Sequence, residues 1–257
     1  MTEALTTFDE DTLQRKLASL RPETALPGFW ESIAANCDQW AREISAGPFW
    51  AEIDKKLDQW RSEYRQATKG ADLLARTGMP PFVGKSATSI KSKVFRKCRA
   101  NLKKSEQIFS TAGAPVPALS DLVRTRIVCR YIDGVEFLAT KMEMLAGEMG
   151  RNPKRDREGR LEGYFAQHLT VDADVFFRID KDAIPAKIRC EIQLATELAT
   201  KMWDASHPFY EFARERDVPA ESWQWNPTDP QFIANQLGHM IHLADGLIVQ
   251  LRHARGE

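Results

Sequence analysis

The sequence predicts an α/β protein of the α+β type, in which helices back a sheet and further helices extend both ends. Three segments, 124–131, 168–175 and 187–194, alternate apolar with polar residues, which is the pattern of half-buried strands. Around them, apolar residues recur at spacings of three and four, which predicts amphipathic helices. Charged residues on a strand face are costly unless they are paired or used, so we expect the chemistry on that face of the sheet.

The first part of the chain is predicted to be helical. Two apolar stripes carry this prediction: Trp30, Ile33, Cys37 and Trp40, then Phe49, Ile53, Leu57, Trp60 and Tyr64. Such stripes are typical of helix packing rather than of a base-stacking surface. The breaker at 78–81 then precedes a basic helix at about 86–108.

The remaining elements are predicted in chain order: a loop at 113–117, a strand at 123–131, a helix at 134–149, a basic loop at 151–162, strands at 168–177 and 186–194, a helix from about 196, interruptions at Pro208 and 223–230, and an amphipathic helix at 232–252. This order predicts three parts: an N-terminal helical segment (1–76), a central domain (77–215) and a C-terminal helical extension packed on that domain (216–257).

Composition narrows the class of protein. The 257 residues carry 36 basic and 36 acidic side chains, and the length suits one large domain with additions. The chain has no long apolar run and an acidic N-terminus, so neither a membrane span nor a secretory signal is predicted. The scattered cysteines form no Cys-x-x-Cys pair, which favours reduced core residues in a cytoplasmic protein.

The zero net charge hides segregation. Residues 85–104 carry eight basic side chains and no acid, and 151–160 adds five more around Asp156 and Glu158. A solvated helix face usually mixes both signs, so an acid-free run favours a polyanionic ligand, although a solvated surface alone would explain it equally well.

Four short motifs resemble the RelA/SpoT synthetase domain, the family that makes the alarmone (p)ppGpp. They are Lys85-x3-Ser89-x3-Lys93-x2-Arg96, Asp121-x4-Arg126-Ile127, Gly163-Tyr164-Phe165-Ala166-Gln167-His168 and Glu191-Ile192-Gln193-Leu194-Ala195-Thr196. The match covers roughly 82–210, about half of the chain. The resemblance implies a mixed, about five-stranded sheet of nucleotidyltransferase-like fold, in a stand-alone small alarmone synthetase.

The reaction implied by the resemblance moves the β,γ-pyrophosphate of ATP to the 3′-hydroxyl of GDP or GTP, giving (p)ppGpp and AMP. Such chemistry requires positioning, cations around the phosphates and a base near the nucleophile. Asp121 and Glu191 match the catalytic and Mg²⁺ positions, with Glu191 as metal ligand or general base. Without the motif, Asp121 would be read as a strand-entry cap.

The resemblance also assigns the nucleotide contacts. The expected ATP-binding residues are Lys85, Ser89, Lys93 and Arg96 at the phosphates and Arg126 at the adenine, with Arg124 on the same charged strand face. The expected acceptor-binding residues are Tyr164 stacked on the base, His168 at the phosphate or ribose, Gln193 as an orienting group, and Arg155 and Arg157 as compensating cations. His207 falls where the family has a helix histidine, whereas His239 and His242 are read as structural.

Three departures from the motifs leave alternatives open. Val83 stands where the family has a second stacking arginine, Ala166 replaces a serine and Ala195 an arginine. A second interpretation is therefore a toxic small alarmone synthetase that acts on adenine nucleotides or the tRNA 3′ CCA end and pairs with a cognate antitoxin. A third is a catalytically silent nucleotide sensor. The amphipathic end helices leave a homo-oligomer open.

Overall fold

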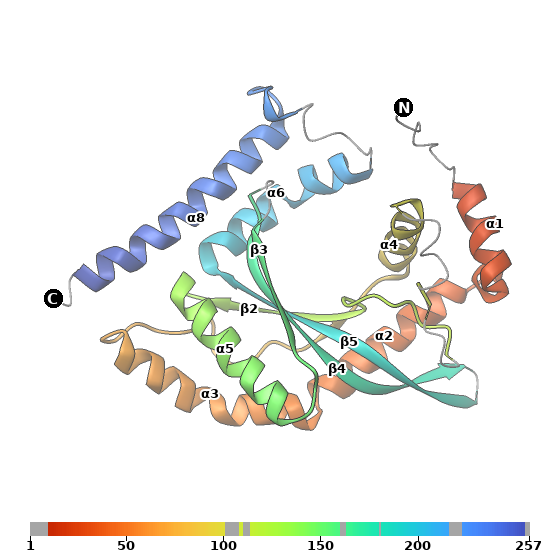
Figure 1. The fold of residues 1–257 in the computed structure, drawn as a ribbon, viewed down its shortest axis with the longest axis horizontal. Coiled ribbons are helices and arrows are strands. Elements are labelled where there is room, and N and C mark those ends of the chain that lie inside the picture. Colours follow the sequence, from red (N-terminus) through yellow and green to blue (C-terminus); the bar gives the residue numbers. More distant parts are fainter. Residues whose placement is uncertain are drawn as a thin grey trace. The chain divides into compact units, whose positions relative to one another are not determined.

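The computed structural model describes residues 10–100, 108–109, 114–159, 163–179, 181–215 and 223–254. Its helices are α1 (Glu10–Leu20), the 3-10 helix η1 (Pro22–Ala25), α2 (Phe29–Ser45), α3 (Pro48–Ala67), α4 (Ala87–Ala100), α5 (Ile132–Glu148), α6 (Glu197–Glu215) and α8 (Pro230–Ala254) (Figure 1). Of the predicted basic segments, Lys103, Lys104 and Arg160 lie outside the described residues.

A five-stranded sheet confirms the predicted fold class. Its strands are β1 (Val83–Gly84), β2 (Val123–Cys129), β3 (Lys154–Gly159), β4 (Phe165–Ile179) and β5 (Asp182–Thr196). They lie in the order β1-β2-β5-β4-β3, and β1 pairs with β2 in antiparallel register. The prediction of a basic loop at 151–162 was wrong, because β3 lies within this range at the edge of the sheet. Its residues do not alternate between apolar and polar, so the pattern used to predict strands is absent there.

Helix α6 corrects a second expectation. Pro208 lies inside this helix and does not interrupt it. A proline in a helix interior removes one backbone donor and crowds the preceding turn. These effects can kink a helix without ending it.

The chain forms two compact units. Unit 1 consists of the chain up to Trp50, Pro81–Thr125 and Thr170–Glu191; unit 2 consists of Ala51–Pro80, Arg126–Leu169 and the chain from Ile192 onward. Within unit 1, α2 packs on β1, η1 and α4, and α1 packs on η1 and α4. Within unit 2, α8 packs on α6 and α5 (Figure 1).

The core of unit 1 forms around the predicted stripe of α2. Trp40 is fully buried and donates its indole N–H to the carbonyl of Phe176 at 2.8 Å. Asn36 exchanges two hydrogen bonds with the backbone of Arg178, so its side chain satisfies this part of β4 as a neighbouring strand would. Cys37 and the other three cysteines are free and buried, as predicted, and burial raises the pKa of the Cys37 thiol to about 12.

In unit 2 the apolar face of α5 is buried, through Val135, Leu138, Ala139, Met142, Leu145 and Ala146. Tyr64 of α3 donates a hydrogen bond of 2.9 Å to Asp133 at the start of this helix.

None of the helices in the described segments has the length and apolarity needed to cross a membrane.

Candidate functional site

Gly84 allows β1 to lie directly against α2. A Cβ at this position would meet the backbone nitrogen of Asp38 at 2.7 Å and the carbonyl carbon of Cys37 at 2.8 Å, closer than real contacts allow. One residue later, the backbone N–H of Lys85 donates to the carbonyl of Leu122 at 2.9 Å. This bond continues the β1–β2 pairing and brings Lys85 beside Asp121.

Lys93 is placed by α4, which begins directly after Lys85. Ser86 caps the helix: its carbonyl accepts from the N–H of Ile90 at 2.9 Å, and its hydroxyl lies 3.4 Å from the N–H of Ser89. Ser86 also donates its hydroxyl hydrogen to Ser89 at 3.0 Å. Ser86 is therefore the N-cap of α4, and Lys93 lies one helical turn after Ser89.

Asp121 lies between two ammonium groups. Lys85 Nζ is 2.8 Å from its Oδ2, and Lys93 Nζ is 2.7 Å from its Oδ1. The side chains are 12%, 22% and 9% exposed for Lys85, Lys93 and Asp121, so these charges are largely removed from water. Burial alone would raise the pKa of Asp121, but the two ammonium groups lower it to about 2.

Glu191 belongs to the same group of charges. It is the last residue of β5 within unit 1 and is buried, at 8% exposure. Burial lowers the pKa of Lys93, whereas the negative charge of Asp121 and, to a smaller extent, that of Glu191 raise it. We call Lys85, Lys93, Asp121 and Glu191 the Asp121 cluster. Arg96, half-buried on α4, makes no ion pair within the described residues, and Arg124 is exposed on β2.

The Asp121 cluster fits a divalent ion only in part. No group of three or more histidine, cysteine, aspartate or glutamate side chains in the described segments is arranged to hold a metal. Mg²⁺, however, commonly takes one or two carboxylates and completes its shell with substrate phosphates and water. Asp121 and Glu191 therefore suit an ion that arrives with a nucleotide.

Unit 2 holds the predicted acceptor residues. Gly163 has φ +75° and lies against α8, where a Cβ would meet the carbonyl oxygen of Asn235 at 2.4 Å. Gly238 is equally constrained, since its Cβ would meet the carbonyl oxygen of Gly163 at 2.3 Å. Two glycines are thus required where the turn before Tyr164 contacts α8.

Tyr164, Trp203 and His168 form an aromatic group that we call the Tyr164 platform. The rings of Tyr164 and Trp203 lie 4.4 Å apart at 55°, and the Tyr164 hydroxyl is 3.0 Å from Nε2 of His168. His207 meets Trp203 edge-on at 5.1 Å. Beside this platform is a pocket lined by Tyr164, Met202, Trp203, Ser206, Gly238 and Ile241, among others.

Arg126 and the helix α6 are also placed within unit 2. The guanidinium of Arg126 donates to Gln193 Oε1 at 3.3 Å and pairs with Asp204 at 3.3 Å. Thr196, the last residue of the β5 motif, caps α6 by accepting from the N–H of Ala199 at 3.0 Å. Its hydroxyl donates in turn to the buried Asp245 of α8, whose pKa burial raises.

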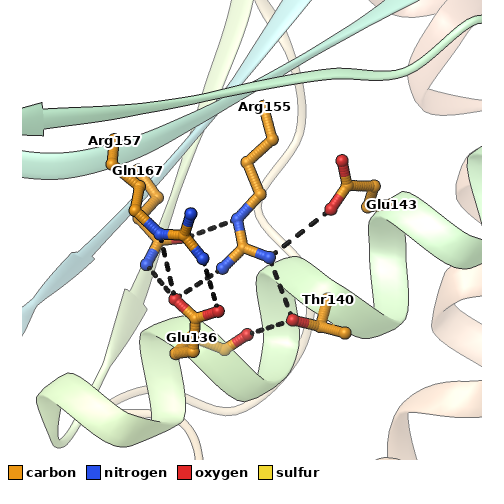
Figure 2. Close-up of polar contacts among 6 residues, drawn as sticks. All are labelled: Glu136, Thr140, Glu143, Arg155, Arg157 and Gln167. Atoms are coloured by element: carbon orange, nitrogen blue, oxygen red, sulfur yellow. Dashed lines mark hydrogen bonds and ion pairs between the residues drawn. The ribbon is translucent and has the colours of Figure 1, made fainter.

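Arg155 and Arg157 of β3 face acidic partners on α5 (Figure 2). Arg155 donates to Gln167 at 2.7 Å and to Thr140 at 2.9 Å, and it pairs with Glu136 at 2.7 Å. Arg157 also pairs with Glu136, at 2.8 Å. Burial would raise the pKa of Glu136, but the hydrogen bonds from Arg157, Gln167 and Arg155 lower it to about 2. These two arginines join β3 to α5, so their charge is already balanced.

We predict that Arg155→Lys lowers the free energy of unfolding by about 1–3 kcal/mol, because lysine cannot serve several fixed acceptors with one planar group. Arg155 is 8% exposed, so its partners lose protein hydrogen bonds without full access to water. Arg157→Lys is the matched control: Arg157 is 68% exposed, and we expect a change below about 0.5 kcal/mol. Urea unfolding measures both, and equal effects would contradict this structural role.

The structure brings the predicted residues together in two groups. In unit 1, Lys85 and Lys93 contact Asp121, and the charge of the buried Glu191 acts on Lys93. In unit 2, Tyr164 contacts His168. Trp203 and Asp204 were not assigned a role from the sequence. Both fall in the helix predicted from about 196, about one turn before His207. Ser86 could have been recognised, because a serine directly before a helix is a common N-cap, whereas the acidic partners of Arg155 carried no local signal.

Comparison of the sequence with protein-family profiles and with curated proteins found no match. Among solved structures, the chain is similar to small alarmone synthetase 1 from Bacillus subtilis bound to its product pppGpp, with 17% identity over 85% of this chain and 99% of that one, at a TM-score of 0.49. It is also similar to a GTP pyrophosphokinase family protein from Streptococcus pneumoniae (18% identity, 88% and 93% covered, TM-score 0.47) and to small alarmone synthetase 2 from Bacillus subtilis (16%, 78% and 93%, 0.45). Likenesses at this level of identity and TM-score assign the chain neither an activity nor a substrate.

Proposed function

We propose that this chain is an ATP-dependent nucleotide pyrophosphokinase of the RelA/SpoT synthetase type, with GDP or GTP as the acceptor. The observation that carries the proposal is the Asp121 cluster: one buried carboxylate held by two ammonium groups, with a second buried carboxylate nearby. Two buried carboxylates and two largely buried ammonium groups are costly to maintain in a protein that does not use them. Three of the four sequence motifs supply the residues of the cluster, and the resemblance that these motifs carry implies ATP and Mg²⁺ as its ligands.

The donor phosphates are assigned to the basic residues of unit 1. Lys85 and Lys93 leave Asp121 for the phosphate oxygens when ATP binds, and Arg96 adds a third cation from the same helix face. Mg²⁺, held by Asp121 and Glu191 together with the phosphates, would neutralise charge on the transferred group. Arg126 is assigned to the adenine, where its planar guanidinium stacks once Asp204 releases it.

The acceptor is assigned to the Tyr164 platform. The half-buried ring of Tyr164, supported by Trp203, is suited to a nucleobase, and His168 is suited to a hydrogen bond to the ribose or phosphate. Arg155 and Arg157, predicted from the sequence as compensating cations at the acceptor, are instead paired with glutamates of α5 in this structure and have no part in the proposed acceptor site. Gln193 keeps its proposed orienting role and contacts Arg126.

The chemical step balances with these groups. The acceptor 3′-oxygen forms a bond to the β-phosphorus of ATP, and the bond from that phosphorus to the oxygen bridging to the α-phosphate breaks. Glu191 accepts the proton of the 3′-hydroxyl, and AMP leaves with the bridging oxygen. The lysines and Arg96 stabilise the charge that develops on the phosphate oxygens.

A transfer assay with γ-labelled ATP and Mg²⁺ tests the proposal. GDP, GTP, adenine nucleotides and deacylated tRNA are offered separately, with the Asp121→Asn protein as the blank. Label in ppGpp or pppGpp is the expected result. Nucleotide binding without transfer to any acceptor would contradict the proposal and favour the silent sensor.

The acid-free helix α4 supports a second candidate function, that of a toxic small alarmone synthetase that acts on tRNA or on adenine nucleotides. Its charged residues within the described part are all basic: Lys91, Lys93, Arg96, Lys97 and Arg99. A basic helix without acids suits a nucleic-acid backbone as well as a nucleotide. Label appearing on the 3′ end of tRNA, or on an adenine nucleotide, would identify the toxic type of synthetase, for which an antitoxin is the expected partner.

We predict that Tyr164→Ala raises the KM for the acceptor by about 10- to 100-fold and leaves the KM for ATP unchanged. Stacking of a base on an aromatic ring contributes about 1–3 kcal/mol, and alanine removes it. Tyr164→Phe is the control, because it keeps the ring and loses only the hydroxyl near His168. Initial rates at varied acceptor and ATP concentrations separate the two constants, and an equal rise in both would remove Tyr164 from the acceptor site.

A further inference from the structure

Helix α8 buries its polar and small residues and exposes apolar ones, the reverse of an ordinary surface helix. Its buried residues are polar or small, namely Asn235, Gly238 and Asp245. Seven of its large apolar side chains are exposed, at 39–68%, namely Ile233, Leu237, Met240, Leu243, Leu247, Ile248 and Leu251, whereas Phe232, Ile241 and Val249 are half-buried. The seven are half of the large apolar side chains that are exposed in the described part of the chain, and an amphipathic helix normally buries that face.

Specific polar contacts hold α8 in this orientation. Asp245 accepts a hydrogen bond from Thr196, and Gly238 lies against Gly163. At the end of the helix, Arg252 pairs with Asp133 and lies over the ring of Tyr131 at 4.8 Å from its centroid. Because these contacts anchor α8 at three points, each about two turns from the next, the exposed apolar face is a built feature of unit 2.

The exposed face has a coiled-coil repeat. Ile233, Leu237, Met240, Ala244, Leu247 and Leu251 follow one another at spacings of 4, 3, 4, 3 and 4, and we call this row the α8 seam. A regular alternation of three and four is the pattern with which one helix packs along another. The only Asp, Glu, Lys or Arg residues of α8 are Asp245 and Arg252, both engaged on the inner side, so the seam carries no such charge.

We propose that the α8 seam is a homodimer interface, in which α8 of a second copy of this chain packs antiparallel along it. The spacings read the same in both directions, so a twofold axis near residue 242 places Ile233 opposite Leu251, Leu237 opposite Leu247, and Met240 opposite the small Ala244. The helix dipoles also favour the antiparallel arrangement.

The available area matches a dimer of ordinary size. Seven exposed side chains at roughly 100 Å² each give about 700 Å² per copy, close to the roughly 800 Å² per partner of a standard interface. The seam carries no charged side chain that could form an ion pair, so a highly charged partner protein is disfavoured. A membrane surface is also disfavoured, because such helices carry lysines and arginines on the polar face and α8 has no lysine.

Sedimentation velocity of the full chain over a range of concentrations tests the interface. We expect a species of twice 29.2 kDa that the double variant Met240→Lys/Leu247→Lys converts to the monomer, with a dissociation constant raised at least about a hundredfold. Both side chains are exposed, so the variant should keep the circular dichroism spectrum of the parent. Met144→Lys, an equally exposed apolar position on α5, is the matched control and should stay dimeric.

Three results would overturn the proposal. They are a monomeric parent at every concentration, a double variant that remains dimeric, and a monomer that instead co-sediments with phosphatidylglycerol vesicles.

The relative direction of the two α8 helices is tested by disulfide crosslinking of introduced cysteines. The four native cysteines are buried, so they do not interfere. Mixed Leu237→Cys and Leu247→Cys proteins should crosslink to each other, whereas crosslinking of each variant with itself would indicate a parallel pair. None of these measurements depends on catalysis, so they are independent of the proposed activity.

Discussion

Asp121→Asn is expected to lower the turnover of the proposed transfer by roughly a thousandfold while ATP still binds. The carboxylate is the charge that the reaction needs near the phosphates, and asparagine keeps its shape without that charge. In the structure, Asp121 also occupies Lys85 and Lys93, at 2.8 and 2.7 Å. Asparagine would release both ammonium groups, so the affinity for ATP without Mg²⁺ should stay equal or increase.

This divergence between binding and turnover distinguishes catalysis from structural support. Isothermal titration with ATP gives the affinity, and single-turnover kinetics gives the rate of transfer. Asp38→Asn is a matched control, since Asp38 is an exposed aspartate of unit 1 on α2. Loss of ATP binding together with turnover would mean that Asp121 mainly holds the lysines in place.

The same substitution has a stability readout with a defined sign. The pKa of Asp121 is lowered from 3.8 to about 2 in the folded protein, so its ion pairs stabilise the fold above pH 3.8 and are lost as the pH falls toward 2. Asparagine leaves two buried ammonium groups unbalanced, and we expect a loss of about 3 kcal/mol at neutral pH. That loss should shrink on acidification, because the parent then loses the same interaction.

The residues of the proposed donor site were named by the resemblance to the family's motifs, and local sequence predicted the elements that carry them. The four-residue spacing of Lys85, Ser89 and Lys93 pointed to one helix start, and the strand after Asp121 was read from alternation. Lys85 itself lies on the loop between β1 and α4, directly before the predicted start of the helix. Only the β1–β2 pairing, made possible by Gly84, explains why Lys85 reaches Asp121.

Long-range partners were not predictable. Arg155 and Arg157 looked like free cations in a basic loop, because nothing local indicates that Glu136, nineteen residues before Arg155, lies on a helix beside them. The apolar repeat of α8 was equally visible in the sequence, but periodicity does not say which face is buried. The contacts of Gly163 with Gly238 and of Thr196 with Asp245 decide that, and they join residues that are far apart in the chain.

Glu191→Gln is expected to lower kcat by about a hundred- to ten-thousandfold, with little change in either KM. Glutamine fills the same buried position but cannot accept the proton of the 3′-hydroxyl. If Glu191 is the general base, the fall of kcat toward acid in the parent should be absent in the variant. The control is Glu197→Gln, a glutamate at the start of α6 whose side chain is 44% exposed.

The pair of carboxylates can then be separated by a double variant. If Asp121 and Glu191 act in one step, the double substitution should cost little more than the stronger single one, because either loss already removes the catalysed pathway. Multiplicative losses would instead place the two residues in independent roles, one at the metal and one at the nucleophile. If Glu191→Gln kept full turnover with an unchanged pH profile, proton transfer would have to be assigned to another group, and Glu191 would remain as the charge that balances Lys93.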